Sequence, residues 1–273
     1  MASGIDGEGL VGVAVEAALA GAAVVAEGAG SEGPDVRVKG RAGDYVTAVD
    51  RRSEAATADA LWSNTGIPVV GEEEGGTSTS GRRYWVVDPL DGTTNFIHGF
   101  HVVGVSVALV EDGRPVVGVV HAPFLGDTFV GARGRGAEAR RAPGRTEPLR
   151  VSDREPDRAV VATGFPFRRK DVLPRYLAMF GAALGRFEDL RRPGAASLDL
   201  AWTAAGVFDG FFELGLWPWD VAAGGLLIEE AGGRVTDWTG GPDYLAGDIL
   251  AGPPDVHDEL LRLARETGET PTG

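Results

Sequence analysis

The chain has 273 residues, with 40 acidic and 26 basic side chains and a formal net charge of −14. It contains no cysteine, which excludes disulfides, zinc–thiolate sites, iron–sulfur clusters and thiol catalysis. The acidic balance argues against a general nucleic-acid binder, because such proteins neutralise phosphates with Lys and Arg. It leaves room for an acidic site that collects divalent cations.

A long apolar run at 10–26 predicts a buried N-terminal helix. The preceding residues include Asp6 and Glu8 but no Lys or Arg, so the positively charged start of a signal peptide is missing. About 17 residues are short for a membrane span, and Glu16 sits in the middle of the run. We therefore expect a cytoplasmic protein with no membrane partner.

The first half is predicted to combine helices with an antiparallel meander. The stretch YVTAVD at 45–50 precedes a predicted helix, and Asp112-Gly113 is typical of a hairpin turn. The expected elements are a helix over 51–64 and strands over 67–70, 84–87, 102–110, 115–121 and 128–132. Residues 75–82 are predicted to be a loop. The Arg- and Gly-rich stretch 133–148 is predicted to be a solvated loop and a boundary between halves.

Strands and helices alternate in the second half. The expected strands are 159–163, 211–214, 234–238 and 250–251, and the expected helices are 172–184, 198–207, 220–231 and 255–265. Interleaved elements in both halves predict a mixed α/β, layered fold. We place the N-terminal half, with an antiparallel meander, at 1–145 and the C-terminal half at 146–273.

Four acidic clusters stand at the end of a predicted strand or at the start of a helix. They are Asp50, the GEE triplet at 71–73, the string DPLDGTTNF at 88–96 and the pair Trp219-Asp220. Carboxylate oxygens are the ligands that Mg²⁺ prefers. The four positions are therefore candidates for one cation site.

The string at 88–96 is the most informative of the four. Asp88 and Asp91 can converge on a hard cation around a turn, with the carbonyl of Leu90 between them. Gly92 permits a close backbone approach to a ligand, and residues 93–95 resemble a helix start whose N–H groups could face a phosphate. The alternative is an Asx turn in which both aspartates only cap the backbone.

These strings, taken together, resemble the inositol monophosphatase family of Mg²⁺-dependent, lithium-sensitive phosphatases. The resemblance rests on GEE at 71–73, DPLDGTTNF at 88–96 and WDVAAG at 219–224, supported by KGRAGDYVTAVD at 39–50, GAASLDLAWTAAG at 194–206 and FELGLWPWDVAAG at 212–224. It extends from the first helix to Gly233 in the same order and spacing. It implies a layered αβαβα sandwich.

The resemblance also implies a site with two to three Mg²⁺ ions. Glu72, Asp88 and the Leu90 carbonyl would hold the first ion, and Asp88, Asp91 and Asp220 would hold the second. Glu72 would also face a third, weaker ion. The implied catalytic residues are Glu72, Thr93 and Asp50, which would orient and deprotonate an attacking water.

On the substrate side, the resemblance implies that the N–H groups of Gly92 and Thr93 hold the phosphate. Asp91 and Glu213 would bind hydroxyl groups, although a solvated surface role for Glu213 stays open. Gly194, Ala195 and Ala196 would form a backbone contact loop. Residues 163–166 would edge the pocket, and Lys39 would either reach a metal-bound water or lie at the surface.

We therefore expect an enzyme that hydrolyses a small phosphate monoester, with inositol 1-phosphate as the leading substrate. Fructose 1,6-bisphosphate, histidinol phosphate, a nucleotide phosphate such as 3′-phosphoadenosine 5′-phosphate or a phosphorylated cyclitol or sugar of secondary metabolism remain alternatives. The resemblance implies a homodimer. A second hypothesis is a regulatory member of the family that binds protein partners. The net charge of −14 disfavours direct binding to RNA but not binding to proteins.

Overall fold

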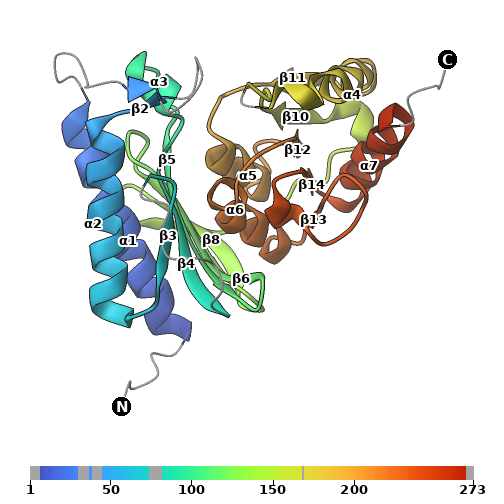
Figure 1. Ribbon diagram of the computed structural model, residues 1–273. Helices are drawn as coiled ribbons and strands as arrows, with labels where there is room; N and C mark the ends of the chain where they lie inside the picture. Colours follow the sequence, from blue (N-terminus) through green and yellow to red (C-terminus); the bar gives the residue numbers. More distant parts are fainter. Residues whose placement is uncertain (1–6, 30–36, 39–44, 74–81, 168, 269–273) are drawn as a thin grey trace.

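The computed structural model describes residues 7–29, 37–38, 45–73, 82–167 and 169–268. These residues form five layers that alternate between helices and sheets (Figure 1). The predicted αβαβα sandwich is therefore confirmed. The helices are α1 (Gly7–Gly28) and α2 (Ala48–Thr65) in the first layer, α5 (Ala196–Ala204) and α6 (Pro218–Glu230) in the third, α4 (Leu173–Arg186) and α7 (Pro254–Gly268) in the fifth, and the short α3 (Thr93–Ile97) beside the first sheet.

The second layer is a seven-stranded sheet in the order β3-β4-β5-β6-β7-β8-β9. Its strands are β3 (Val69–Gly71), β4 (Arg83–Asp91), β5 (Gly104–Glu111), β6 (Arg114–Ala122), β7 (Asp127–Ala132), β8 (Gly136–Arg141) and β9 (Arg145–Pro148). Only the β3–β4 pair is parallel within this sheet. A separate two-stranded ribbon joins β1 (Arg37–Val38) to β2 (Tyr45–Val46).

The fourth layer is a mixed five-stranded sheet in the order β11-β10-β12-β14-β13. Its strands are β10 (Val160–Thr163), β11 (Asp189–Arg191), β12 (Gly210–Glu213), β13 (Arg234–Thr236) and β14 (Ile249–Gly252). Strand β10 runs parallel to both neighbours, whereas β14 is antiparallel to β12 and β13. Three 3₁₀ turns lie at Pro156–Arg158, Lys170–Val172 and Tyr244–Ala246. The division into halves at residue 145, which falls at the start of β9, stays a prediction.

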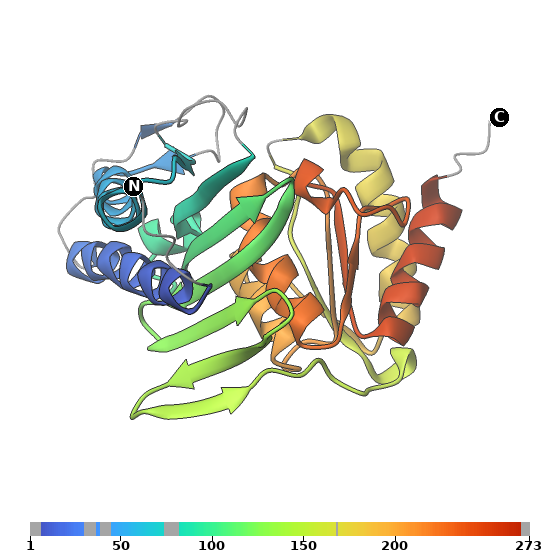
Figure 2. The same cartoon turned by 90° about the horizontal axis from the view of Figure 1, so that it is seen from below.

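The central strands of the two large sheets are covered by helices on both faces, as the view from below shows (Figure 2), whereas β8 and β9 extend beyond this cover. Neighbouring residues of one strand therefore enter different cores: Val119 packs under α1, whereas Val120 packs under the central helices. Phe211 and Phe212 divide in the same way between the central and outer helices. Burial on both faces explains why these strands read as continuous apolar runs rather than alternating ones.

Helix α1 is long and apolar enough to cross a membrane, and it is the single such helix among the described residues. Its small side chains instead pack on α2 and on the first sheet, at Leu10, Ala14, Ala17, Ala18, Ala22 and Val25. This buried face is the pattern of a core helix and agrees with the expected buried N-terminal helix.

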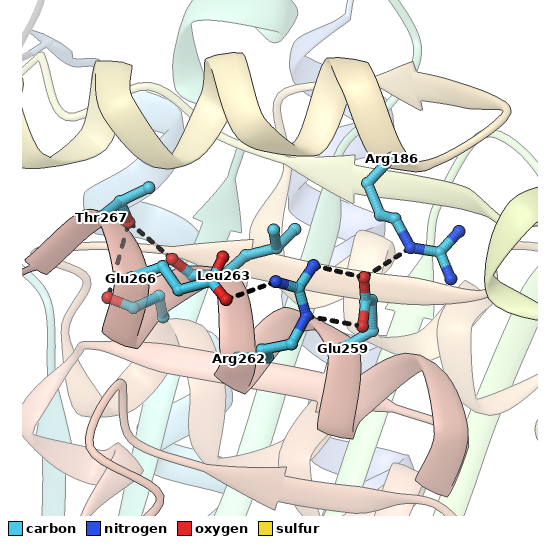
Figure 3. Close-up of polar contacts among 7 residues, drawn as sticks. Arg186, Glu259, Arg262, Leu263, Glu266 and Thr267 are labelled. Carbon is cyan, nitrogen blue, oxygen red and sulfur yellow. Dashed lines mark hydrogen bonds and ion pairs between the residues drawn. The ribbon is translucent and has the colours of Figure 1, made fainter.

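The outer helices are joined by a charged network (Figure 3). Arg186 at the end of α4 donates to Glu259 of α7, and Arg262 binds both Glu259 and Glu266. The hydrogen bonds from Arg262, together with that from Arg186, lower the pKa of Glu259 to about 2. This network links the surfaces of two helices whose buried sides pack together through an apolar core.

Two expectations about element boundaries are wrong. The predicted loop at 133–148 contains strands β8 and β9, in which Ala139 faces inward while Arg141 pairs with Glu147 at 2.9 Å. Alanine and arginine gave little apolar signal, although they fit a sheet with one solvated face. Helix α2 begins at 48 rather than 51, because Thr47 caps it and places Asp50 inside its first turn.

The central layer packs closely on the first sheet at Gly118. A methyl group at this position would lie 2.9 Å from the backbone oxygen of Ala223 on α6. We expect Gly118→Ala to lower the free energy of unfolding by about 1–3 kcal/mol, because backbone cannot move aside as a flexible side chain can. Gly181→Ala is the control, since its methyl group meets nothing within 4 Å. That control should gain about 0.5–1 kcal/mol. Equal effects of the two changes in denaturant melts would contradict the packing argument.

Candidate metal and phosphate site

The first two acids of the site come from an irregular end of β4. Asp88 pairs with Ser106 of β5 and Asp91 pairs with Gly104, so three steps on β4 match two steps on its partner. In a regular strand, residues three apart face opposite sides of the sheet. The extra residue of the bulge turns Asp91 back toward the side of Asp88. The predicted strand over 84–87 therefore continues through Asp91, and the predicted turn is this bulge.

The third acid comes from the central helix layer. Asp220 lies in the first turn of α6, where its Oδ2 accepts a hydrogen bond of 2.7 Å from the backbone N–H of Trp217. Each of Asp88, Asp91 and Asp220 offers a carboxylate oxygen within 4.8 Å of the others, and all three residues are buried. The structure thus brings the three predicted acidic ligands of the second ion together.

Electrostatics in this group are unfavourable to three ionised carboxylates. Burial raises the pKa of Asp88 well above its usual range, and the nearby charges of Glu72, Asp91 and Asp220 raise it further. Burial also raises the pKa of Asp91 to about 6, although hydrogen bonds from Ser197 oppose this effect. A cation among them would favour the ionised forms.

Glu72 follows β3 and lines the same pocket as the three aspartates. It is half-buried. The loop is fixed by Glu54 of α2, whose Oε2 accepts a hydrogen bond of 2.7 Å from the N–H of Glu73. A methyl group at Gly71 would lie 2.3 Å from the Glu54 carboxyl carbon, so a larger residue here would displace the Glu54 side chain. The sequence interpretation overlooked Glu54, which lies inside a helix away from the acidic strings.

Thr93 and Asp50 meet at the edge of the site. The Thr93 hydroxyl donates to Asp50 Oδ1 at 3.0 Å and also approaches the Leu90 carbonyl at 3.2 Å. Asp50 is held from the other side by Thr47, whose N–H and hydroxyl both donate to Oδ2 at 2.8 and 2.5 Å. Burial raises the pKa of Asp50, and these hydrogen bonds oppose the shift. The capping box of α2 therefore positions Thr93.

The substrate-side loop at 194–196 touches the metal-side motif directly. Gly92 and Gly194 both have positive φ angles, of 92° and 95°, which glycine adopts without strain. A methyl group on Gly92 would lie 3.3 Å from the Ala195 Cβ. The Ser197 N–H and hydroxyl both donate to Asp91 Oδ2, at 2.7 and 2.6 Å. The two predicted groups therefore share one pocket.

The far wall of the pocket comes from the second sheet and its loops. Gly164, Phe165, Pro166 and Glu213 line it, whereas Thr163 is buried behind and donates to the Phe212 carbonyl. Glu213 is buried and ends β12. That position disfavours the alternative of a solvated surface glutamate. Lys39 lies outside the described residues.

Three charged residues that the sequence interpretation did not assign also line the pocket: Arg169, Arg192 and Asp199. The Arg192 guanidinium lies over the rings of Phe165 and Phe167, at 5.2 and 5.5 Å from their centroids. Arg192 directly precedes Pro193-Gly194, next to the predicted contact loop, and this position in the sequence could have indicated that it lines the pocket. His98 and His101, for which no metal role was expected, are exposed.

The donor set fits a hard divalent cation. It consists of carboxylate oxygens, with the Leu90 carbonyl beside them, and no imidazole or thiolate joins the group among the described residues. Oxygen-only ligands suit Mg²⁺ or Ca²⁺ rather than zinc or copper. A cation in this position would relieve the repulsion among the buried carboxylates.

Comparisons with known proteins agree with this geometry. The model of the inositol monophosphatase family matches residues 6–269. The chain is 40% identical over 264 residues to a protein named Nus factor SuhB of Escherichia coli, covering 94% of this chain and 96% of the relative.

Two solved structures are similar over nearly their whole length. One is extragenic suppressor protein suhB from Bartonella henselae, with 35% identity and a TM-score of 0.87, covering 94% of this chain and 98% of that one. The other is inositol monophosphatase from Anabaena (Nostoc), with 36% identity and a TM-score of 0.83, covering 95% and 96%. Relatives of this chain therefore carry names of two kinds, one enzymatic and one regulatory.

Replacing Asp220 with Asn tests whether this acid is a ligand or a helix cap. The amide oxygen can still accept from the Trp217 N–H, whereas the negative charge near Asp88 is removed. We expect the melting temperature without Mg²⁺ to stay equal or rise, and the rise that Mg²⁺ produces in the wild type to be largely lost. A lower melting temperature with a full response to Mg²⁺ would identify Asp220 as a cap only.

The response to Mg²⁺ should depend on pH. The pKa of Asp91 is 3.8 in its ordinary state and about 6 in the folded protein. Without a cation, the contribution of Asp91 to the free energy of unfolding is therefore greatest below pH 3.8. It is lost as the pH rises through about 6. Saturating Mg²⁺ should raise the melting temperature by about 5 °C at pH 7.5, and by less at pH 5. Equal shifts in thermal melts at the two pH values would count against carboxylate crowding.

Proposed function

The chain belongs to the inositol monophosphatase family, and we propose that it is a Mg²⁺-dependent phosphomonoesterase that acts on inositol 1-phosphate or a similar polyol phosphate. One observation carries the proposal. Three buried carboxylates converge within 4.8 Å of one another, in a pocket that Glu72 and Thr93 also line. Such a cluster opposes folding unless a cation occupies it, and cations beside a phosphate pocket serve phosphoryl transfer.

The proposed ligands divide into two overlapping sets. Glu72, Asp88 and the Leu90 carbonyl would hold one ion, and Asp88, Asp91 and Asp220 would hold a second, with Glu72 also facing a third, weaker one. When bound, Mg²⁺ neutralises charge on the phosphate, activates water and stabilises the leaving oxygen. The Asp88 hydrogen bond from the Leu90 N–H, at 3.0 Å, aims the carboxylate and the neighbouring carbonyl into one space.

Thr93 and Asp50 would orient the attacking water together with Glu72. The Thr93 hydroxyl uses its only proton toward Asp50 and Leu90. Its lone pairs are therefore left to accept a hydrogen bond from water. Glu72, which is more accessible than the aspartates, would accept a second hydrogen bond from this water.

The substrate would lie across both halves of the pocket. The phosphate would contact the backbone N–H groups of Gly92 and Thr93, and the alcohol part would face the loop 194–196 and the Glu213 carboxylate. Asp91 would contribute through the oxygen that does not accept from Ser197.

The decisive experiment is a phosphate-release assay with a panel of small phosphate esters. The panel contains inositol 1-phosphate, fructose 1,6-bisphosphate, histidinol phosphate and 3′-phosphoadenosine 5′-phosphate. We expect turnover that requires Mg²⁺, that is abolished by EDTA and that is inhibited by Li⁺. Full turnover in EDTA would refute the mechanism, and a different preferred ester would correct only the substrate.

Thr93 offers a matched pair of variants. Thr93→Val keeps the shape but removes the hydroxyl, and we expect kcat to fall by about 10²-fold or more, with a small change in KM. Thr93→Ser keeps the hydroxyl and should retain kcat within about tenfold. Similar kcat values for the Val and Ser variants in steady-state assays would show that the hydroxyl has no role in the reaction.

A second candidate function is regulation through protein partners, favoured by the name Nus factor of relatives such as the one from Escherichia coli. The two functions can coexist, and the Asp220→Asn variant separates them. If the cellular role depends on protein contacts alone, this variant should complement deletion of the gene as well as the wild type. A role that depends on turnover should be lost.

A cytoplasmic homodimer completes the proposal. The exposed apolar side chains of the second half include Leu177, Leu184, Val207 and Trp217, and they offer surface for such contacts. Light scattering at micromolar concentration should give twice the chain mass of 28.4 kDa.

A further inference from the structure

Asp199 on α5 is a buried acid that the proposed mechanism does not use. Its relative exposure is 1%, and its Oδ1 has no hydrogen-bond partner among the described residues. Buried polar side chains almost always have partners, and each exception calls for an explanation. Burial raises the pKa of Asp199 well above its usual range, and the charges of Asp91 and Glu213 add to this effect. A carboxyl oxygen can accept a hydrogen bond in either protonation state.

The position of Asp199 points to the substrate pocket. Its backbone N–H donates to the Ala195 carbonyl at 2.9 Å, one helical turn away. Residues three and four apart share a helix face, and Ala195, Ala196 and Asp199 all line the pocket. Asp199 therefore lies on the pocket side of α5, behind the single methyl groups of the two alanines.

Glu213 lies on the wall of the same pocket. A methyl group on Gly164 would lie 2.1 Å from both Glu213 carboxylate oxygens, so the bare backbone of Gly164 makes room for this acid. Glu213 reaches the pocket from the end of β12, whereas Asp199 reaches it from α5. Two acidic residues from different layers therefore line the pocket that the alcohol part of a substrate would enter.

Asp209 is a buried aspartate with a structural role, and it provides a comparison for Asp199. It is fully buried, and both of its oxygens have partners: Oδ1 accepts from Arg154 Nη1 and Oδ2 accepts from the Val160 N–H, each at 2.7 Å. Asp199 has the same residue type and burial but lacks such partners for Oδ1. The contrast indicates that its hydrogen-bonding capacity is kept for a ligand.

We propose that Asp199 is a specificity-determining residue, whose carboxyl hydrogen-bonds one hydroxyl of the substrate's alcohol part while Glu213 binds another. This inference rests on the proposed phosphatase function. Esters of simple alcohols or phenols would reach the phosphate and metal contacts without using Asp199.

The test compares Asp199→Leu, Asp199→Asn and the control Asp209→Asn, each with inositol 1-phosphate and with 4-nitrophenyl phosphate. The second ester has no hydroxyl group to bind. Kinetic constants and melting temperatures are measured for the wild type and all three variants. Asp199→Leu should raise KM for inositol 1-phosphate by about tenfold and raise KM for 4-nitrophenyl phosphate by a clearly smaller factor. Its melting temperature should not fall, because an unpaired polar group is replaced by an apolar one.

The other two variants complete the pattern. Asp199→Asn should keep KM for inositol 1-phosphate within about threefold, because an amide also donates and accepts. Asp209→Asn should lower the melting temperature and leave the KM ratio of the two esters unchanged. Equal effects of Asp199→Leu on both esters, or an unchanged KM for inositol 1-phosphate, would overturn the inference. A wild type that hydrolyses neither ester would refute the proposed function, and the inference with it.

Discussion

Mutual repulsion among buried carboxylates is the constraint around which this molecule is organised. Asp88, Asp91 and Asp220 stand within 4.8 Å of one another in a space that raises the pKa of Asp88 and Asp91. Hydrophobic burial elsewhere must offset this cost, because unpaired buried charges oppose folding. The three-core sandwich provides that burial, and it holds the acids on a strand and a helix start rather than on free loops. A divalent cation turns the same crowding into binding affinity.

The layered architecture also explains why the pocket has two chemical sides. The metal-side residues come from the end of β4 and the loop after β3, whereas the alcohol side comes from α5, β12 and the loop after β10. Ser197 joins the sides by donating twice to Asp91. Asn95 joins them again, because its side-chain amide donates to the carbonyls of Val102 and Pro193. Substrate contacts are thereby held in register with the ligand acids.

Much of this arrangement could be predicted from the sequence, and the reasons are local. Apolar runs and glycine breaks placed most strands and helices, and the acidic strings, through a family resemblance, pointed to the three carboxylates that the structure brings together. The bulge at 88–91 could not be predicted from periodicity, because a regular strand puts Asp88 and Asp91 on opposite faces. Strand β8 was missed because its buried residue is an alanine, Ala139, and β9 was missed because none of its residues is buried or strongly apolar. Asp199 was missed because it lies inside an apolar helix, where only the tertiary structure shows that its carboxyl has no partner.

The same energetics bear on the choice between an enzyme and a regulatory protein. A chain that acted only through its outer surface would gain stability from replacing any one of the three clustered aspartates with a neutral residue of similar shape. This chain instead keeps all three, together with the Thr47 and Thr93 contacts that fix Asp50 and the glycine at 71 that makes room for Glu54. It also leaves Asp199 Oδ1 unpaired, whereas Asp209 shows that the fold can satisfy a buried aspartate. Several destabilising features that converge on one pocket are the expected mark of a site shaped for a cation and a polar ligand.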